Sequence, residues 1–112
     1  MEQLYLTGNL GADPQMRYTD NGKAVVTFSL AVSQRKNPDG EVRPPNWYRC
    51  TAWEKRAETI NKYLNKGDKI LVIGRVSADH YTNEESGEHY CNLIVNVRNI
   101  EFLNTKKLGK VE

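Results

Sequence analysis

The chain has 112 residues, of which 38% are hydrophobic and 27% charged, and its formal net charge at pH 7 is +2. This length predicts one domain with a single core, and no run of about 18 apolar residues that would span a membrane occurs. The first residues, MEQLYLTGNL, lack the basic region and long apolar stretch of a secretory signal, so we expect an intracellular protein.

The first half of the chain predicts three strands. Residues 3–10 (QLYLTGNL) are extended, and glycines and a proline bend or end the run near residues 8–14. Residues 23–33 (KAVVTFSLAVS) are rich in β-branched side chains and follow turn chemistry at Asn21-Gly22. A polar loop then leads to a third strand at residues 46–53, NWYRCTAW.

The second half predicts one helix and two strands. Apolar residues recur every three or four positions over residues 54–67 (EKRAETINKYLNKG), and Gly67 stands where a helix commonly ends. Strands follow at 68–81, where Gly74 marks a bend or a close approach, and at 89–103. Three strands, a helix and two strands predict an all-β, five-stranded Greek-key barrel of the OB type with the helix between strands 3 and 4. An SH3-like barrel or a small sandwich matches the strand count but needs no helix there.

The third strand has two different faces. The period of two places Trp47, Arg49, Thr51 and Trp53 on one face and Tyr48, Cys50 and Ala52 on the other. We expect the face with Arg49 to be open, because burying an unpaired guanidinium is costly. Exposed indoles beside a guanidinium suit single-stranded nucleic acid, whose bases stack on the rings. The alternative is that both tryptophans are core residues, since large aromatics are highly buried on average.

Positive charge is concentrated in one part of the sequence. Residues 17–75 hold twelve Lys/Arg against six Asp/Glu, whereas residues 76–103 hold Arg98 alone against five acidic residues. One face of the molecule is therefore predicted to be basic although the whole chain is nearly neutral. The cations that would extend a track for phosphates are Arg17, Lys23, Arg35, Lys36, Arg43 and Lys55.

The sequence offers little support for catalysis or for a bound metal. His80 and His89 flank the acidic loop at 82–88, but they lack any recognised ligand spacing. No glycine-rich phosphate loop or nucleophile elbow occurs. Cys50 and Cys91 lie outside any CxxC pattern and are expected to be buried thiols. We predict no catalytic residue, no metal site and no cofactor.

Three long segments resemble the bacterial single-stranded DNA-binding proteins. They are GNLGADPQMRYTDNGKAVVTFSLAVS, NWYRCTAWEKRAETINKYLNKGDKILVIGRV and YTNEESGEHY, which together cover nearly the whole chain. The resemblance implies a non-enzymatic OB-fold domain in the cytoplasm of a bacterium, associated with the nucleoid. It also implies a homotetramer that protects single-stranded DNA during replication, recombination and repair, with little sequence preference.

The resemblance also implies roles for individual residues. Trp47, Trp53 and Tyr81 match the family's stacking aromatics, and Arg17 and Lys55 match basic residues that line the DNA path. Some relatives carry another stacking tryptophan after the second strand, where this chain has Arg35 and Lys36. Charge would replace stacking at that place. The predicted subunit-interface residues are Tyr48, which matches an interface position, and Leu4 and Leu6 of the first strand, which would pair across a dimer.

Two further expectations concern the end of the chain and the class of protein. The domain is expected to cover residues 1–104, followed by a short, flexible, basic tail at 105–112. The family's long tail with an acidic tip is absent from this sequence, so we do not expect repair proteins to be recruited through one. The alternatives to DNA binding are an OB-fold protein-interaction or primosome accessory subunit and an RNA-binding protein of the cold-shock kind.

Overall fold

The computed structural model describes residues 2–34, 36–82, 84–87 and 89–104. The predicted tail at 105–112 and Arg35 lie outside the described residues. The side chains at 79–81, 89–91 and 104 also lie outside the described part, and they include Tyr81, His80, His89 and Cys91. Among the described residues, no helix is long and apolar enough to cross a membrane.

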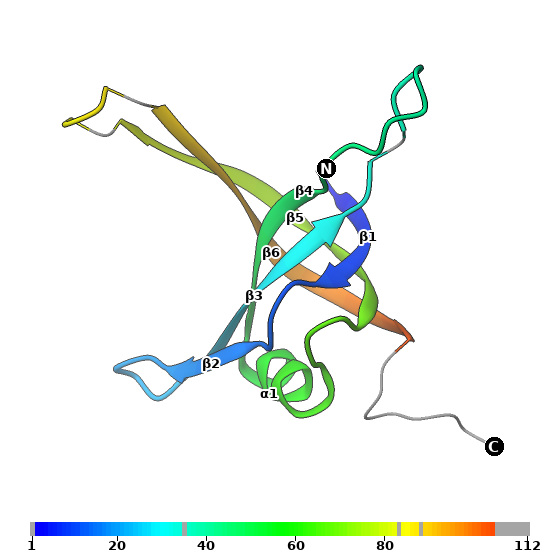
Figure 1. Cartoon of the computed structure of the whole chain (residues 1–112). Coiled ribbons are helices and arrows are strands. Elements are labelled where there is room, and N and C mark those ends of the chain that lie inside the picture. Colours follow the sequence, from blue (N-terminus) through cyan, green and yellow to red (C-terminus); the bar gives the residue numbers. More distant parts are fainter. Residues whose placement is uncertain (1, 35, 83, 88, 105–112) are drawn as a thin grey trace.

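Five strands form a closed barrel, as predicted from the sequence (Figure 1). Neighbouring strands follow the order β1-β5-β6-β4-β3-β2, and the barrel closes because β1 also pairs with β3. All pairings are antiparallel except that of β4 with β6, which is parallel. The elements are β1 (Leu4–Leu10), β2 (Gln15–Tyr18), β3 (Ala24–Val32), β4 (Asn46–Trp53), α1 (Glu54–Tyr63), β5 (Lys69–Thr82) and β6 (His89–Asn104).

The short strand β2 was not expected from the sequence. Its four residues, QMRY, carry no clear alternation of polar and apolar side chains, so they give a weak signal on their own. They become a strand because the predicted turn folds them back onto β3, where Gln15 is paired with Thr27 and Tyr18 with Ala24. In that turn Gly22 has φ +80°, a conformation that favours glycine.

Helix α1 ends earlier than the sequence predicts, at Tyr63 rather than near Gly67. The chain turns because Leu64 leaves the helix in an extended conformation and is buried. The backbone N–H of Asn65 then donates to Oδ2 of Asp68 (2.8 Å), and the N–H of Gly67 donates to the carbonyl oxygen of Leu10 (2.9 Å). A hydrogen-bonded turn therefore replaces the last predicted helical turn and ties it to the end of β1.

Strands β5 and β6 form a long hairpin that extends beyond the barrel (Figure 1). Its register shifts between Ile73 and Gly74, so that Ile73 is paired with Asn99 while Gly74 is paired with Val97. Arg98 is left without a partner on β5 and forms a bulge. A Cβ atom on Gly74 would overlap the carbonyl oxygen of Asn96, which explains the glycine and confirms the predicted close approach.

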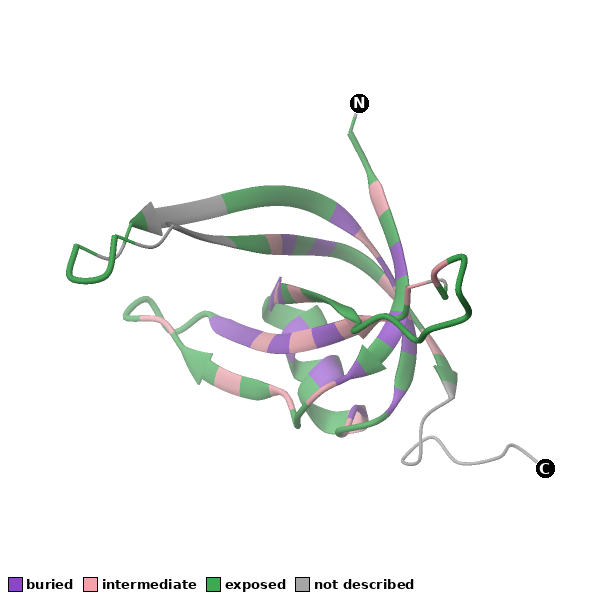
Figure 2. Ribbon diagram, turned by 45° about the horizontal axis from the view of Figure 1, so that its top comes forward, coloured by how far each residue is buried: buried purple, intermediate pink, exposed green. Residues whose placement is uncertain are grey.

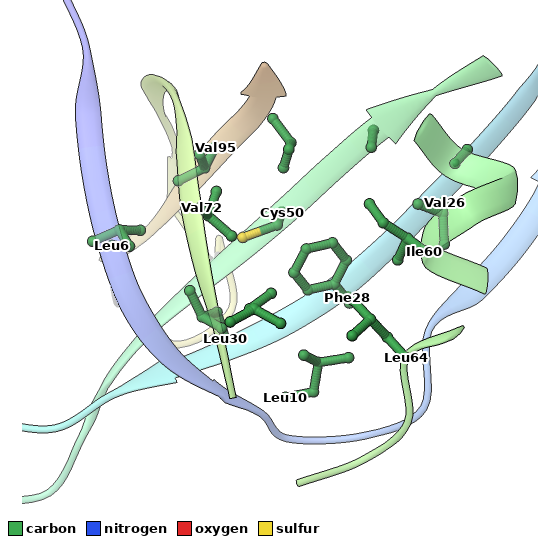
Figure 3. Packing of buried hydrophobic residues seen from close by; sticks show 14 of the residues in the cluster. Leu6, Leu10, Val26, Phe28, Leu30, Cys50, Ile60, Leu64, Val72 and Val95 are labelled. Atoms are coloured by element: carbon green, nitrogen blue, oxygen red, sulfur yellow. The ribbon is translucent and has the colours of Figure 1, made fainter. Parts of the chain in front are cut away.

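The core fills the barrel and extends under α1 (Figure 3). Figure 3 shows Ile60 and Leu64 directed toward Phe28, so the helix covers one end of the barrel. Cys50 is fully buried at the centre as a free thiol. Burial raises the pKa of this thiol from 9.0 to about 12, because the apolar surroundings disfavour the thiolate. The thiol is therefore uncharged at physiological pH.

Candidate functional site

Strand β4 has one buried and one open face, as the period of two predicted. Figure 2 shows how buried and exposed residues follow one another along the strands of the barrel. Cys50 and Ala52 are fully buried in the barrel. Trp47 and Trp53 are 55% and 42% exposed, and Arg49 between them is exposed as well. The alternative that both indoles are core residues is therefore excluded for this chain. We call the outer side of β4, with Trp47, Arg49, Thr51 and Trp53, the open face.

The indole of Trp47 lies against the backbone of Gly11. A Cβ atom on Gly11 would lie 2.5 Å from Cζ3 and 2.7 Å from Cη2 of Trp47, which is closer than side-chain atoms pack. The N–H of Gly11 donates to the carbonyl oxygen of Ser29 (3.0 Å), so β3 fixes the glycine in turn. Glycine at this position allows the ring to lie against the main chain.

Trp47 borders a hollow of about 340 Å³. It is lined by Ser29, Trp47, Arg49, Asn92 and Leu93 and will be called the Trp47 hollow. Leu93 is 37% exposed, so the hollow has apolar surface on the β6 side as well as on the indole. Arg49 also borders a smaller hollow beside β2, of about 110 Å³. Arg49 therefore borders two hollows of the open face.

Trp53 stands in a row of side chains that crosses three strands. Its partner on β3 is Val25, and the partner of Val25 on β2 is Arg17. Val25 is fully buried although it lies outside the main core cluster, between Arg17 and Trp53 on the adjacent strands. Arg17 itself is exposed. The row thus places a cation two strands away from the exposed indole.

A third hollow, of about 390 Å³, lies beside Trp53, on the side of β6 and α1. It is lined by Trp53, Arg56, Asn96, Val97 and Arg98 and will be called the Trp53 hollow. Neither Arg56 nor Arg98 was among the DNA-binding residues predicted from the sequence. The periodicity of α1 shows Arg56 only as a solvent-side residue, and Arg98 reaches Trp53 through the parallel pairing of β4 with β6. Pairing between strands distant in the sequence has no local signature.

The other predicted DNA-binding residues lie outside β4. Lys55 is exposed in the first turn of α1, and Lys36 is exposed in the loop that joins β3 to β4. Arg35 and the side chain of Tyr81 lie outside the described part of the chain. Trp47, Arg49 and Trp53 are thus brought together on the open face, and Arg17 approaches it from β2.

The predicted subunit-interface residues face the interior of this chain. Leu6 is buried in the core, and Leu4 and Tyr48 are partly buried and pack against it. Their surface toward a second subunit is small in the single chain. Their role at an interface stays a prediction. In the described part of the chain, no three His, Cys, Asp or Glu residues form a group that would hold a metal ion.

Changing Gly11 to alanine is expected to displace the indole of Trp47 without unfolding the protein. The stacking of a base on this ring that the sequence predicts, about 1–3 kcal/mol, would then be lost in part or in full. Titration of each variant with a labelled oligo-dT measures the loss. A double-mutant cycle with Trp47→Ala tests the cause. Gly11→Ala should have little effect once the indole is gone, and an equal loss in both backgrounds would contradict the steric explanation.

Comparisons with known proteins show the family of the chain. A model of the single-strand binding protein family matches residues 1–103. The chain is 32% identical over 107 residues to single-stranded DNA-binding protein 1 of Synechocystis, covering 96% of this chain and 87% of that protein. It is 36% identical over 110 residues to single-stranded DNA-binding protein A of Bacillus subtilis, covering 97% of this chain but 63% of that protein.

A solved structure is similar as well. It is the crystal structure of a deletion mutant of the single-stranded DNA binding protein from Thermus aquaticus. The TM-score is 0.68 at 33% sequence identity, and the match covers 92% of this chain and 41% of that one. The present chain therefore spans less than half of that structure and about two thirds of several bacterial relatives.

Proposed function

Because the chain belongs to the single-strand binding protein family, we propose that it binds single-stranded DNA without catalysing a reaction. Unpaired bases stack on Trp47 and Trp53, and cations on and around the open face hold the phosphates. The observation that carries the proposal is the exposure of both indoles on one face of β4 with Arg49 between them. Large aromatic side chains without a packing partner on one side are suited to accept a base.

The geometry of the open face favours binding with little sequence preference. Stacking uses the π face that every base has, and a cation reads only the phosphate. Trp47 and Trp53 are six residues apart on one strand, a distance of about 20 Å. They therefore stack on bases that are several nucleotides apart, and the intervening nucleotides pass over Arg49 and Thr51.

We further propose that the chain forms a homotetramer in the bacterial cytoplasm and protects DNA exposed during replication, recombination and repair. Family membership supports both statements. Several such barrels in one assembly would allow a long strand to run from one open face to the next. Mass measurement in solution, with and without an oligo-dT of several tens of nucleotides, tests the assembly. A tetrameric mass is expected without DNA, and that mass increased by the bound oligonucleotide with it; a monomeric mass would contradict the proposal.

The proposed binding is tested by the emission of the two tryptophans, which are the only indoles in the chain. Oligo-dT is expected to quench this emission. The affinity should fall as salt rises, with a slope of about −0.7 in log K against log salt for each phosphate neutralised. Oligo-rU in parallel separates DNA binding from RNA binding. Unchanged emission at saturating oligo-dT would mean that the open face does not accept bases.

A further inference from the structure

The Trp53 hollow continues the open face beyond Trp53. Arg49 and Thr51 of β4 are paired with Ile94 and Asn96 of β6. When this parallel register is continued by two residues, Trp53 lies opposite Arg98. Both residues line the hollow, together with Arg56 from the third residue of α1. Figure 1 shows that α1 follows β4 directly beneath the barrel. Three separate elements thus bring one exposed indole and two guanidinium groups to a single hollow.

The β-bulge explains why Arg98 is available at this place. The register shift after Ile73 leaves Arg98 outside the ladder with β5, and a bulge changes the direction of a side chain and increases the local twist. The neighbour Val97 points into the core and is buried, whereas Arg98 is exposed. Gly74 permits the bulge because it has no Cβ atom to strike the backbone of Asn96. The fold therefore presents this guanidinium outward on a rigid strand.

Charge in the Trp53 hollow favours an anion. In the described part of the chain, neither Arg56 nor Arg98 forms an ion pair or a side-chain hydrogen bond. The described residues that line this hollow include no carboxylate. Arg98 also borders a neighbouring hollow with Arg75, Gln3 and Glu2. The Glu2 carboxylate disfavours a phosphate there, so the Arg56 side is the better position for one.

We propose that Arg56 and Arg98 form a phosphate-binding site that holds the DNA backbone next to the base stacked on Trp53. The site extends the DNA path from β4 onto β6 and α1, and it rests on the proposed binding to single-stranded DNA. A planar guanidinium suits this role because it offers paired donors to phosphate oxygens. With Arg17 on the β2 side of the same row, cations then flank Trp53 on both sides.

The salt dependence of oligo-dT binding tests the site. Arg98→Gln and Arg56→Gln should each make the slope of log K against log salt less steep by about 0.7, and the double variant by about 1.4. Arg98→Lys should keep most of the slope, because it retains the charge. Lys62→Gln is the matched control: it removes one positive charge from the last turn of the same helix, where Lys62 lies over the ring of Tyr63. Its slope should equal that of the original chain.

The outcomes separate this inference from the proposed function. Quenching of the original chain by oligo-dT establishes DNA binding independently of the two arginines. If quenching occurs but the Gln variants keep the original salt slope, the proposed phosphate-binding site is wrong, and the proposed binding to single-stranded DNA is still supported. An equal change in the Lys62→Gln control would also overturn the site, because it would show an effect of net charge alone. Circular dichroism of each variant verifies that the barrel is intact.

Discussion

Replacing both tryptophans with alanine is expected to weaken binding to single-stranded DNA by about 2–6 kcal/mol. Each stacked base contributes about 1–3 kcal/mol, so each single variant should lose about that amount. The two contributions should be nearly additive, because the side chains lie about 20 Å apart on the strand and share no partner. The double variant has no intrinsic indole emission. Binding is therefore measured by the fluorescence anisotropy of a labelled oligo-dT.

A pair of phenylalanine substitutions is the control for this prediction. Trp47→Phe and Trp53→Phe keep an aromatic ring on the open face and should retain most of the affinity. If the double alanine variant binds oligo-dT as tightly as the original chain, stacking on β4 is not the mode of binding. If the phenylalanine variants lose as much as the alanine variants, the indoles act through something other than a flat ring.

The two alanine variants should differ in stability. Trp47 is the more exposed indole, so its removal should change the free energy of unfolding little. Trp53 is paired with Val25, which is fully buried on the outer side of the sheet. Trp53→Ala would expose part of that valine and should cost on the order of 1 kcal/mol. Urea denaturation followed by circular dichroism separates this cost from the loss of DNA affinity.

Local patterns predicted five of the six described strands, the barrel and the faces of β4. The alternation in NWYRCTAW was sufficient because a strand with one buried face repeats with a strict period of two. Gly74 was identified as a bend or a close approach because a glycine weakens a strand unless the backbone needs the space of a missing side chain. The predicted end of the helix, near Gly67, was wrong for a physical reason. Gly67 does adopt a positive φ, but it does so in a turn that Asp68 and the end of β1 stabilise.

The missed parts of the site depend on contacts between distant segments. Gly11 looked like ordinary turn chemistry, and only the folded chain shows that the ring of Trp47 lies against it. Arg98 was counted as the single cation of an acidic segment, yet the parallel pairing of β4 with β6 brings it to Trp53. Sequence periodicity gives the face of a residue within its own element. It does not give the residues that a neighbouring element adds to that face.

Placing the same charge on adjacent residues of β4 should have opposite consequences. Cys50 is fully buried in the barrel, and a carboxylate there would have neither water nor a partner cation. Cys50→Asp is therefore expected to cost several kcal/mol, a large part of the about 5–15 kcal/mol that holds a typical domain folded. Urea denaturation should show a midpoint at a much lower urea concentration than that of the original chain. Cys50→Ala, which only shortens the side chain, should remain folded.

Thr51 is the matched position on the open face, one residue along the strand. It is partly exposed and is paired with Thr27 and Asn96, so a carboxylate there keeps contact with water. Thr51→Asp should leave the unfolding curve nearly unchanged. It should weaken oligo-dT binding by on the order of 1 kcal/mol, because the new charge repels phosphates that pass between Trp47 and Trp53. A Cys50→Asp variant as stable as the original chain, or a Thr51→Asp variant that binds normally, would contradict the assignment of one face of β4 to the core and the other to DNA.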